Sequence, residues 1–205
     1  MPFLIKGIVK PLTSKLTKED YRVVPDRDNW DYVYLTADLA KLLGSKFYSK
    51  RKEIKKFQNG HRHEYSAITP KMLPDILKFQ EEWCKRKDCG DSPSLTQEND
   101  ATIEALKNFD WLGLSGGVVH VEGKVEAFTI GEQLNSQTWV THFEKASPDF
   151  PGLYQFINKE LALQLQHKYV FVNREQDLGQ EGLRVAKTNY HPHHMVEKGM
   201  LLVRG

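Results

Sequence analysis

The stretch YVFVNREQDLGQEGLRVAKTNYHP, residues 169–192, carries the clearest pattern in the chain: an apolar strand, a charged turn and a helix in direct succession. Its first four residues are aromatic or β-branched, as in a buried strand. Leu178, Leu183 and Ala186 then recur at helical spacing. The polar residues 173–177 lie between these two parts, at the carboxyl end of the strand, where open α/β sheets place their chemistry. The turn is therefore either a functional site or a solvated loop.

Composition describes an ordinary soluble protein. The chain has 205 residues, of which 40% are apolar and 27% charged, and its net charge is +2. No apolar run approaches the roughly 18 residues that a transmembrane helix needs, and the start MPFLIKGIVKPL lacks the features of a signal peptide. We therefore expect a cytoplasmic protein without a transmembrane segment, in which any preference for anionic partners comes from local clusters of charge.

The two cysteines, Cys84 and Cys89, lie close together without nearby histidines. This spacing indicates neither a zinc site nor a disulfide framework. We expect both thiols to be reduced and unpaired.

Residues 46–57 are strongly basic. Phe47, Ile54 and Phe57 fall on one face of the predicted helix, and lysines and arginines, among them Lys50 and Arg51, crowd the rest. The basic face is either solvated or binds phosphate groups of a nucleic acid or nucleotide.

The remaining pattern predicts alternating strands and helices. Residues 88–100 are rich in turn formers and are predicted to be a mobile loop. The predicted strands are 3–9, 32–35, 61–68, 112–121, 124–134, 138–146, 169–172 and 195–203, and the predicted helices include 70–87, 101–109 and 153–165. A helix, a helix, three antiparallel strands, a helix, a strand, a helix and a strand follow one another in the order of a GNAT N-acetyltransferase.

We therefore expect an α+β, GNAT-like fold with a mixed, mostly antiparallel sheet flanked by helices. Residues 1–35 would be an N-terminal strand or appendage, and residues 36–205 the GNAT-like domain. In that fold the donor's arm lies in a wedge between two neighbouring parallel strands, here 138–145 and 169–173.

Several motifs resemble the C-terminal domain of the phosphatidylglycerol lysyltransferase family. They are DRDNWDYVY, KFYSKRKEIKKF, GKVEAFTIGEQL, THFEKA and NREQDLGQEGLRVAKTNYHP, and the resemblance runs from about residue 30 to residue 203. That family is similar in fold to the Fem peptidyltransferases, which use aminoacyl-tRNA and build two GNAT units in tandem. The resemblance implies that this chain contains the second unit and lacks the N-terminal one.

The resemblance also implies an acyltransferase that moves an aminoacyl group from aminoacyl-tRNA to an amine or hydroxyl, on a small molecule or a lipid headgroup. Two alternatives stay open: a non-enzymatic module that binds a charged metabolite or RNA, and an acyl-CoA-dependent N-acetyltransferase. No cofactor is fixed by the sequence. The loop SPDFPGLYQ, residues 147–155, has one glycine and an aspartate where acetyl-CoA enzymes carry a glycine-rich pyrophosphate loop, which favours an aminoacyl donor.

A transferase of this kind needs a base, a proton donor and groups that hold an anionic donor. The candidate catalytic residues are Glu144, Glu175, Asp177 and Tyr190. The candidate substrate-binding and donor-binding residues are Lys50, Arg51, His142, Asn173, Arg174, Arg184 and Lys187. His142 and Glu144 alternate on one strand and are predicted to share a face, whereas Arg184 and Lys187 are predicted to project from an exposed helix face. Structural salt bridges explain several of these charges nearly as well.

His191, His193 and His194 do not predict a metal site, because no spaced carboxylate or cysteine completes the ligand set. The predicted strand 3–9 would be exposed if an N-terminal half is missing. This leads us to expect either self-association as a homodimer or a shortened form with incomplete activity.

Overall fold

The computed structural model describes residues 4–13 and 21–203, which belong to two compact units. The central unit comprises residues 36–170. The terminal unit is built from the described residues up to 35 and from 171 onward. The division of the chain predicted from sequence, 1–35 and 36–205, stays a prediction.

The central unit is organised around four antiparallel strands, the last three of which form the predicted meander. Its strands, in their order in the sheet, are β4 (His63–Ala67), β5 (Ser115–Val121), β6 (Lys124–Gln133) and β7 (Thr138–Ala146). The tight turn between β5 and β6 uses Glu122 and Gly123 at φ 51° and 82°, the positive values that two-residue hairpin turns require. The predicted meander is confirmed.

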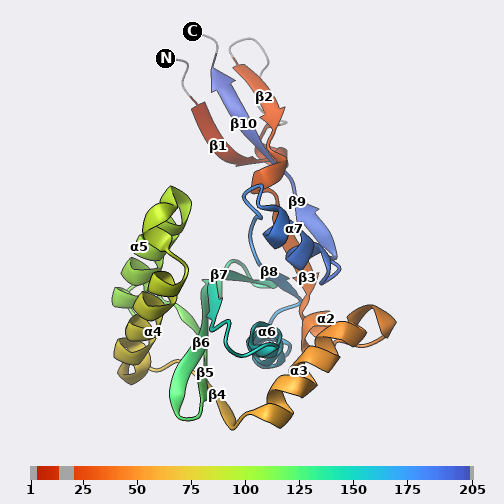
Figure 1. The fold of residues 1–205 in the computed structure, drawn as a ribbon. Helices are drawn as coiled ribbons and strands as arrows, with labels where there is room; N and C mark the ends of the chain where they lie inside the picture. The colour runs from red at the N-terminus through yellow and green to blue at the C-terminus, as the bar shows by residue number, and fades with distance from the viewer. Residues whose placement is uncertain (1–3, 14–20, 204–205) are drawn as a thin grey trace. The chain divides into compact units, whose positions relative to one another are not determined.

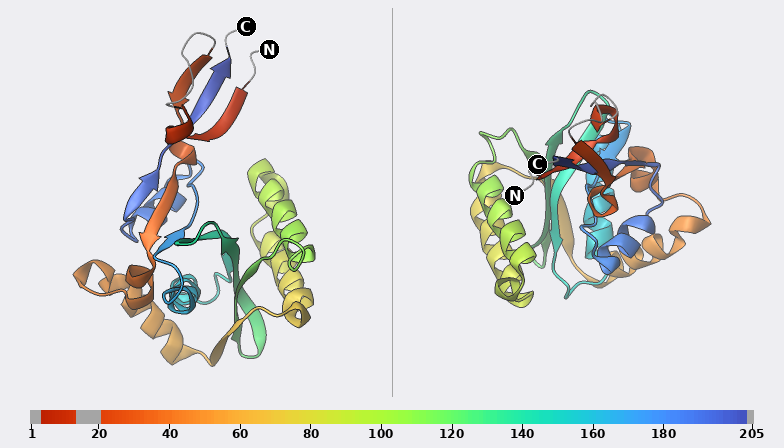
Figure 2. Two further views of the ribbon diagram at one scale, coloured as in Figure 1. Left: turned by 180° about the vertical axis from the view of Figure 1, so that it is seen from behind. Right: turned by 90° about the horizontal axis from the view of Figure 1, so that it is seen from above.

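Helices cover both faces of this meander (Figures 1 and 2). The helix α4 (Leu73–Arg86), preceded by η3 (Pro70–Met72), and the helix α5 (Pro93–Lys107) lie on one face, and α6 (Leu153–Leu165) lies on the other. A core on the α4–α5 side consists of Ile76, Phe79, Trp83, Cys89, Leu106, Phe109, Val118, Phe128 and Ile130. One face of β7 therefore lies toward α4 and α5, and the other lies toward α6.

The predicted loop 88–100 is wrong. A short helix, η4 (Cys89–Asp91), and the first two turns of α5 occupy it. The reason is local: Pro93 stands in the first turn of α5, where its fixed φ favours a helix and its missing N–H costs nothing. The expectation of unpaired thiols is also wrong, because Cys84 and Cys89 form a disulfide.

The basic stretch and the segment before it complete the central unit. They form α2 (Thr36–Lys41), η2 (Ser45–Phe47) and α3 (Tyr48–Gly60). Phe47, Ile54 and Phe57 are buried as predicted. The Phe57 ring packs 5.2 Å from the ring of Phe156 on α6, so the apolar face of the basic helix belongs to the core.

The terminal unit contains two sets of antiparallel strands. The first has the order β1 (Leu4–Val9), β10 (Lys198–Val203), β2 (Tyr21–Pro25). In the second, β3 (Asp31–Leu35) pairs with both β8 (Phe171–Asn173) and β9 (His194–Val196). The remaining elements are α1 (Lys10–Thr13), η1 (Arg27–Asn29) and α7 (Glu181–Thr188).

Three sequence predictions concern this unit. The predicted strand 3–9 is found over its described part, whereas Phe3 lies outside the described residues. The strand predicted at 195–203 is divided at Glu197 into β9 and β10. The apolar stripe of Leu178, Leu183 and Ala186 is exposed, so its helical spacing does not mark a core face.

The order of the elements confirms the α+β, GNAT-like fold: the meander β5–β6–β7 is followed by α6, β8 and α7, with mostly antiparallel sheet flanked by helices. None of the helices in the described ranges is long and apolar enough to cross a membrane.

Candidate functional site

The polar turn that follows β8 is tied back to its own strand. Asn173 is buried, its amide donates to the Asp31 carboxylate at 3.1 Å, and its side-chain oxygen accepts the backbone N–H of Glu175 at 2.7 Å. Lys198 in turn donates to Asp31 at 2.5 Å. Asn173, predicted to bind substrate, therefore shapes the turn.

Asp177 is the centre of a buried network. Its carboxylate accepts hydrogen bonds from the Tyr32 hydroxyl at 2.6 Å, the Gly179 N–H at 2.9 Å and Arg27 at 3.2 Å. Arg184 adds a two-pronged contact, with Nε 3.0 Å from one carboxylate oxygen and Nη2 3.0 Å from the other. The side chain of Asp177 is 0% exposed.

This network decides the charge of Asp177. Burial alone raises the pKa of its carboxyl, but hydrogen bonds from Arg184, Tyr32 and Gly179 outweigh burial and hold the pKa well below its usual range. A carboxylate with both oxygens occupied and so low a pKa is a poor base. Asp177, predicted to be catalytic, is placed to fix the turn rather than to accept a proton.

Arg184 and Lys187 do not project freely from α7, so that expectation is wrong. Arg184 bridges Asp177 and Asp28, with Nη2 2.7 Å from the Asp28 carboxylate. Hydrogen bonds from Arg184 to these two carboxylates raise the pKa of its guanidinium above the ordinary value. Arg184 is therefore directed toward these carboxylates and does not extend freely into solvent.

Lys187 has a comparable role with backbone partners. Its ammonium donates to the carbonyl oxygens of Arg174 at 2.5 Å, Gln176 at 2.7 Å and Glu175 at 3.2 Å. The Lys187 carbonyl accepts the Tyr34 hydroxyl at 2.8 Å. One side chain therefore holds three consecutive peptide units.

The remaining residues of the turn lie at its partly exposed edge. The Arg174 guanidinium lies 5.1 Å from the ring centre of Tyr190 and 5.8 Å from that of Tyr34. Glu175 is half-buried and has φ 56°, a left-handed conformation that is costly for a side chain other than glycine. Tyr190, the predicted proton donor, is buried, which favours a packing role.

A second group of candidates lies on β7 in the central unit. Glu144 is half-buried, and Asn158 of α6 donates to its carboxylate at 3.4 Å. Glu144 pairs across the sheet with Thr129 of β6. The Thr129 hydroxyl and the Asn158 side-chain oxygen are buried and have no hydrogen-bond partner among the described residues, which is unusual for interior polar atoms. Polar groups with unused bonding capacity therefore surround Glu144.

His142 is directed elsewhere than Glu144. The pairing of β6 with β7 shifts between Ile130 and Gly131 and skips His142, so a β-bulge interrupts the alternation on which the predicted shared face rests. The His142 Nε2 lies 3.0 Å from the carboxylate of Glu132. The prediction that His142 and Glu144 share a face is wrong.

The basic candidates on α3 have mixed surroundings. Arg51 donates to the backbone carbonyls of Leu42 and, at 2.7 Å, of Gly44, so it ties α3 to the segment that follows α2. Lys50 is half-buried, whereas Lys55 is exposed. Within the described ranges no three histidine, cysteine or acidic side chains are grouped as metal ligands.

Four residues of these sites were not predicted from the sequence: Arg27, Asp28 and Tyr32 at the Asp177 network, and Asn158 beside Glu144. The stretch PDRDNWDY does carry a signal, because charged residues surround an aromatic one directly before a buried strand. Nothing in the sequence links it to Asp177, about 150 positions away. Asn158 lies inside an apolar helical stripe and stands out only as its polar interruption.

Comparisons with solved structures identify relatives of this fold. A conserved protein of unknown function from Bacteroides thetaiotaomicron is 40% identical, with a TM-score of 0.93 over 99% of this chain and 70% of that one. The C-terminal domain of a candidate lysylphosphatidylglycerol synthetase from Agrobacterium fabrum gives 14% identity and a TM-score of 0.71, over 98% of this chain and 68% of the other. L-PGS from Bacillus licheniformis gives 14% identity and a TM-score of 0.69, over the same shares of the two chains.

A comparison with curated proteins found no significant match. The family model for the C-terminal part of phosphatidylglycerol lysyltransferase matches residues 5–201, nearly the whole chain. The chain therefore belongs to the phosphatidylglycerol lysyltransferase C-terminal family.

Proposed function

We propose that this chain is an aminoacyltransferase that takes its acyl group from aminoacyl-tRNA and passes it to a hydroxyl or amine acceptor, a lipid headgroup or a small molecule. Membership of the family supports the transferase class. The observation that carries the proposal is Glu144, a half-buried carboxylate beside Asn158 and Thr129. The Asn158 side-chain oxygen and the Thr129 hydroxyl are buried and have no hydrogen-bond partner among the described residues. The proposal places the protein in the cytoplasm, where aminoacyl-tRNA is made.

In this reaction the acceptor oxygen or nitrogen attacks the ester carbonyl of the aminoacyl group. The acceptor loses a proton to the Glu144 carboxylate, the bond to the ribose oxygen breaks, and that oxygen takes up a proton. Asn158 donates to Glu144 at 3.4 Å, which orients the carboxylate. The turn 173–177 is a separate candidate binding site: Arg174 and Glu175 are its recognition groups, and Arg184 and Lys187 act by holding that turn.

The loop between β7 and α6 favours an aminoacyl donor over acyl-CoA. Pyrophosphate binding at a helix start uses free backbone amides. Here the N–H groups of Phe150 and Leu153 already donate to the carbonyls of Ser147 and Phe150. Asp149 adds negative charge and forms an ion pair with Arg86.

A transfer assay tests the proposal. The purified chain is incubated with aminoacyl-tRNA carrying one labelled amino acid at a time and with phosphatidylglycerol vesicles or soluble amines, and label is followed into lipid or amine products. We expect transfer with at least one donor, and a loss of roughly a hundredfold or more in Glu144→Gln. Glu104→Gln, which alters an exposed surface pair, is the matched control. Transfer from acyl-CoA alone, or equal rates in both variants, would contradict the proposal.

RNA binding is tested by salt dependence. Lys52, Lys55 and Lys56 are exposed on α3, and each phosphate contact that is lost lowers the slope of log affinity against log salt by about 0.7–0.9. Replacing the three with glutamine should flatten the slope for tRNA. An unchanged slope would remove α3 from the tRNA contact.

Self-association through β1 is the remaining proposal about partners. β1 pairs with β10, which lies between β1 and β2 in the sheet, and β1 is therefore an edge strand of the described sheet. Edge strands offer unpaired backbone groups to a second chain. Light scattering across a concentration series would show a dimer, whereas a constant monomer mass at high concentration would exclude it.

A further inference from the structure

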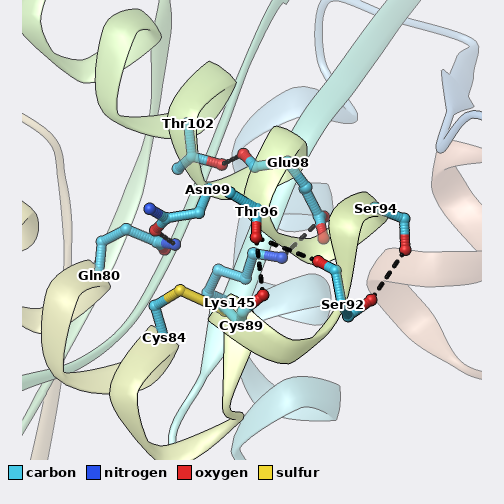
Figure 3. Close-up of a disulfide and its surroundings, with 10 residues drawn as sticks. All are labelled: Gln80, Cys84, Cys89, Ser92, Ser94, Thr96, Glu98, Asn99, Thr102 and Lys145. Atoms are coloured by element: carbon cyan, nitrogen blue, oxygen red, sulfur yellow. Dashed lines mark hydrogen bonds and ion pairs between the residues drawn. A yellow bond between two sulfur atoms is a disulfide. The ribbon is translucent and has the colours of Figure 1, made fainter.

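A disulfide closes the turn between α4 and α5 (Figure 3). Cys84 stands in the last turn of α4 and Cys89 begins η4, with their Cα atoms 5.3 Å apart. Asp88 reverses the chain at φ 49°. A crosslink over five positions closes a short loop, and short loops gain the least stability from a crosslink. The bond therefore stabilises the chain less than a crosslink that closes a long loop would.

The two cysteine residues differ in exposure. Cys84 is half-buried, whereas Cys89 is 4% exposed and belongs to the core on the α4–α5 side. A surface cavity of about 320 Å³, open to solvent, lies beside the bond and is lined by both cysteines and by Glu81, Lys85, Asp88, Gly90 and Asn99. A thiolate arriving from solvent meets Cys84 first.

The Cys89 side of the bond supports the start of α5. The Thr96 hydroxyl donates to the Cys89 carbonyl at 2.8 Å and lies 3.1 Å from the Ser92 carbonyl (Figure 3). The first turn of α5 thus rests on η4. The Cys89 carbonyl and the first turn of α5 are therefore directly linked.

The start of α5 in turn holds a buried cation. Glu98 accepts Lys145 of β7 at 2.7 Å, and the Lys145 side chain is 6% exposed. The Lys145 ammonium also lies 4.4 Å from the ring centre of Trp83. Asn99 accepts the Gln80 amide at 3.0 Å. A continuous set of contacts therefore joins the disulfide to the residue next to Glu144.

We propose that Cys84 and Cys89 form a reversible redox site that a dithiol reductant opens from the Cys84 side, and that its redox state controls the first two turns of α5 and the Lys145–Glu98 pair. The partner is a dithiol, small or protein-borne, able to form its own disulfide. The proposal is independent of the transferase reaction. Because cytosolic disulfides are mostly transient or regulatory, it also fits a cytoplasmic protein.

The thiol–disulfide exchange takes place in two steps. A reductant thiolate attacks Cys84 Sγ, the Cys84–Cys89 bond breaks, and Cys89 leaves as a thiolate that takes a proton. The second thiol of the reductant loses its proton and attacks the reductant sulfur of the mixed disulfide, so that Cys84 is released as a thiol. The protein gains two electrons and two protons, and the dithiol is oxidised to a cyclic disulfide.

The first experiment compares the oxidised full chain with the same chain treated with dithiothreitol under native conditions. Intact mass should show a gain of two hydrogens. Hydrogen exchange in peptides covering residues 92–99 should become at least several-fold faster, while peptides covering β5 and β6 stay unchanged. A bond that resists native reduction, or reduction without faster exchange at 92–99, would overturn the proposal.

The second experiment tests the direction of attack with two variants. Cys89→Ser leaves Cys84 at the cavity, and Cys84→Ser leaves Cys89 in the core. Alkylation by iodoacetamide should be faster for the first variant by on the order of tenfold or more, because reactivity follows exposure. Equal rates in two variants that unfold at temperatures within a few degrees of each other would contradict attack at Cys84. Glu98→Gln, with both cysteines retained, should accelerate exchange at 92–99 without any reductant.

Discussion

The turn after β8 and the turn after α4 are both held in one shape, but by different chemistry. The first has a buried carboxylate, Asp177, with four hydrogen-bonding neighbours, and an ammonium, Lys187, with three carbonyls. The second has one covalent bond and a few polar contacts. The first turn is therefore expected to lose its shape when the charge of Asp177 is removed. The second turn is expected to lose its shape when the disulfide is reduced.

The largest expected effect in this comparison comes from Asp177→Ala. The variant leaves Arg184, Arg27 and the Tyr32 hydroxyl without their shared acceptor, and breaking a buried pair from one side costs roughly 3–5 kcal/mol. Urea unfolding of the purified chain measures this cost. Asp149→Ala, which removes an exposed pair with Arg86, is the control and should cost less than about 1 kcal/mol. Equal costs would show that the Asp177 network does not stabilise the turn.

Lys187→Met keeps most of the side chain and removes its charge. Three backbone carbonyls lose a charged donor, and a hydrogen bond to a charged group contributes about 1.5–3 kcal/mol. We expect a loss of about 2–3 kcal/mol, because the carbonyls regain part of the loss from water. Lys52→Met on the exposed face of α3 should stay within about 0.5 kcal/mol of the parent. A neutral Lys187→Met would mean that the turn keeps its shape without the ammonium.

The paired variant Cys84→Ser with Cys89→Ser should cost about 2 kcal/mol, the value for closing a loop this short. The same variant should be insensitive to dithiothreitol, whereas the parent should lose a similar amount of stability on reduction. Unfolding curves with and without reductant give both numbers. A loss as large as that of Asp177→Ala would show that the disulfide is mainly structural.

The smallest effect concerns pH. The folded-state pKa of Asp177 is lowered, so its contribution is fully present above the unfolded pKa of about 4 and is lost as pH falls toward the folded value. The stability difference between the parent and Asp177→Asn should be constant from pH 5 to 8 and shrink by about 1 kcal/mol between pH 5 and pH 3. A difference that grows on acidification would reverse the sign and exclude the lowered pKa. The disulfide turn should show no such dependence.

The features of the fold that depend on local sequence pattern were predicted correctly. The meander, α6 and the buried residues Phe47, Ile54 and Phe57 follow from periodicity and turn residues, and the α+β, GNAT-like fold follows from their order. Periodicity failed at α5, because Ser92, Pro93 and the polar residues after them read as a turn. There the chemistry of the helix start, a proline in the first turn, outweighs the polar composition.

The candidate site was predicted only in part. The turn 173–177 was found because it interrupts an apolar pattern, but the partners of Asp177 come from the other end of the chain. Arg184 and Lys187 were predicted to be exposed because helical spacing shows only which residues share a face of the helix. It does not show which other residues pack against that face. The bulge at His142 cannot be recognised in the sequence. The side chains around His142 fit an alternating strand pattern equally well with or without it.

Lys187 has a consequence for how the turn responds to ions. Three successive carbonyl oxygens within 2.5–3.2 Å of one positive centre resemble the oxygen ring with which proteins coordinate a monovalent metal ion. Here the cation is supplied by the chain itself and cannot diffuse away. The turn is therefore held by a cation that belongs to the chain, at any concentration of sodium or potassium.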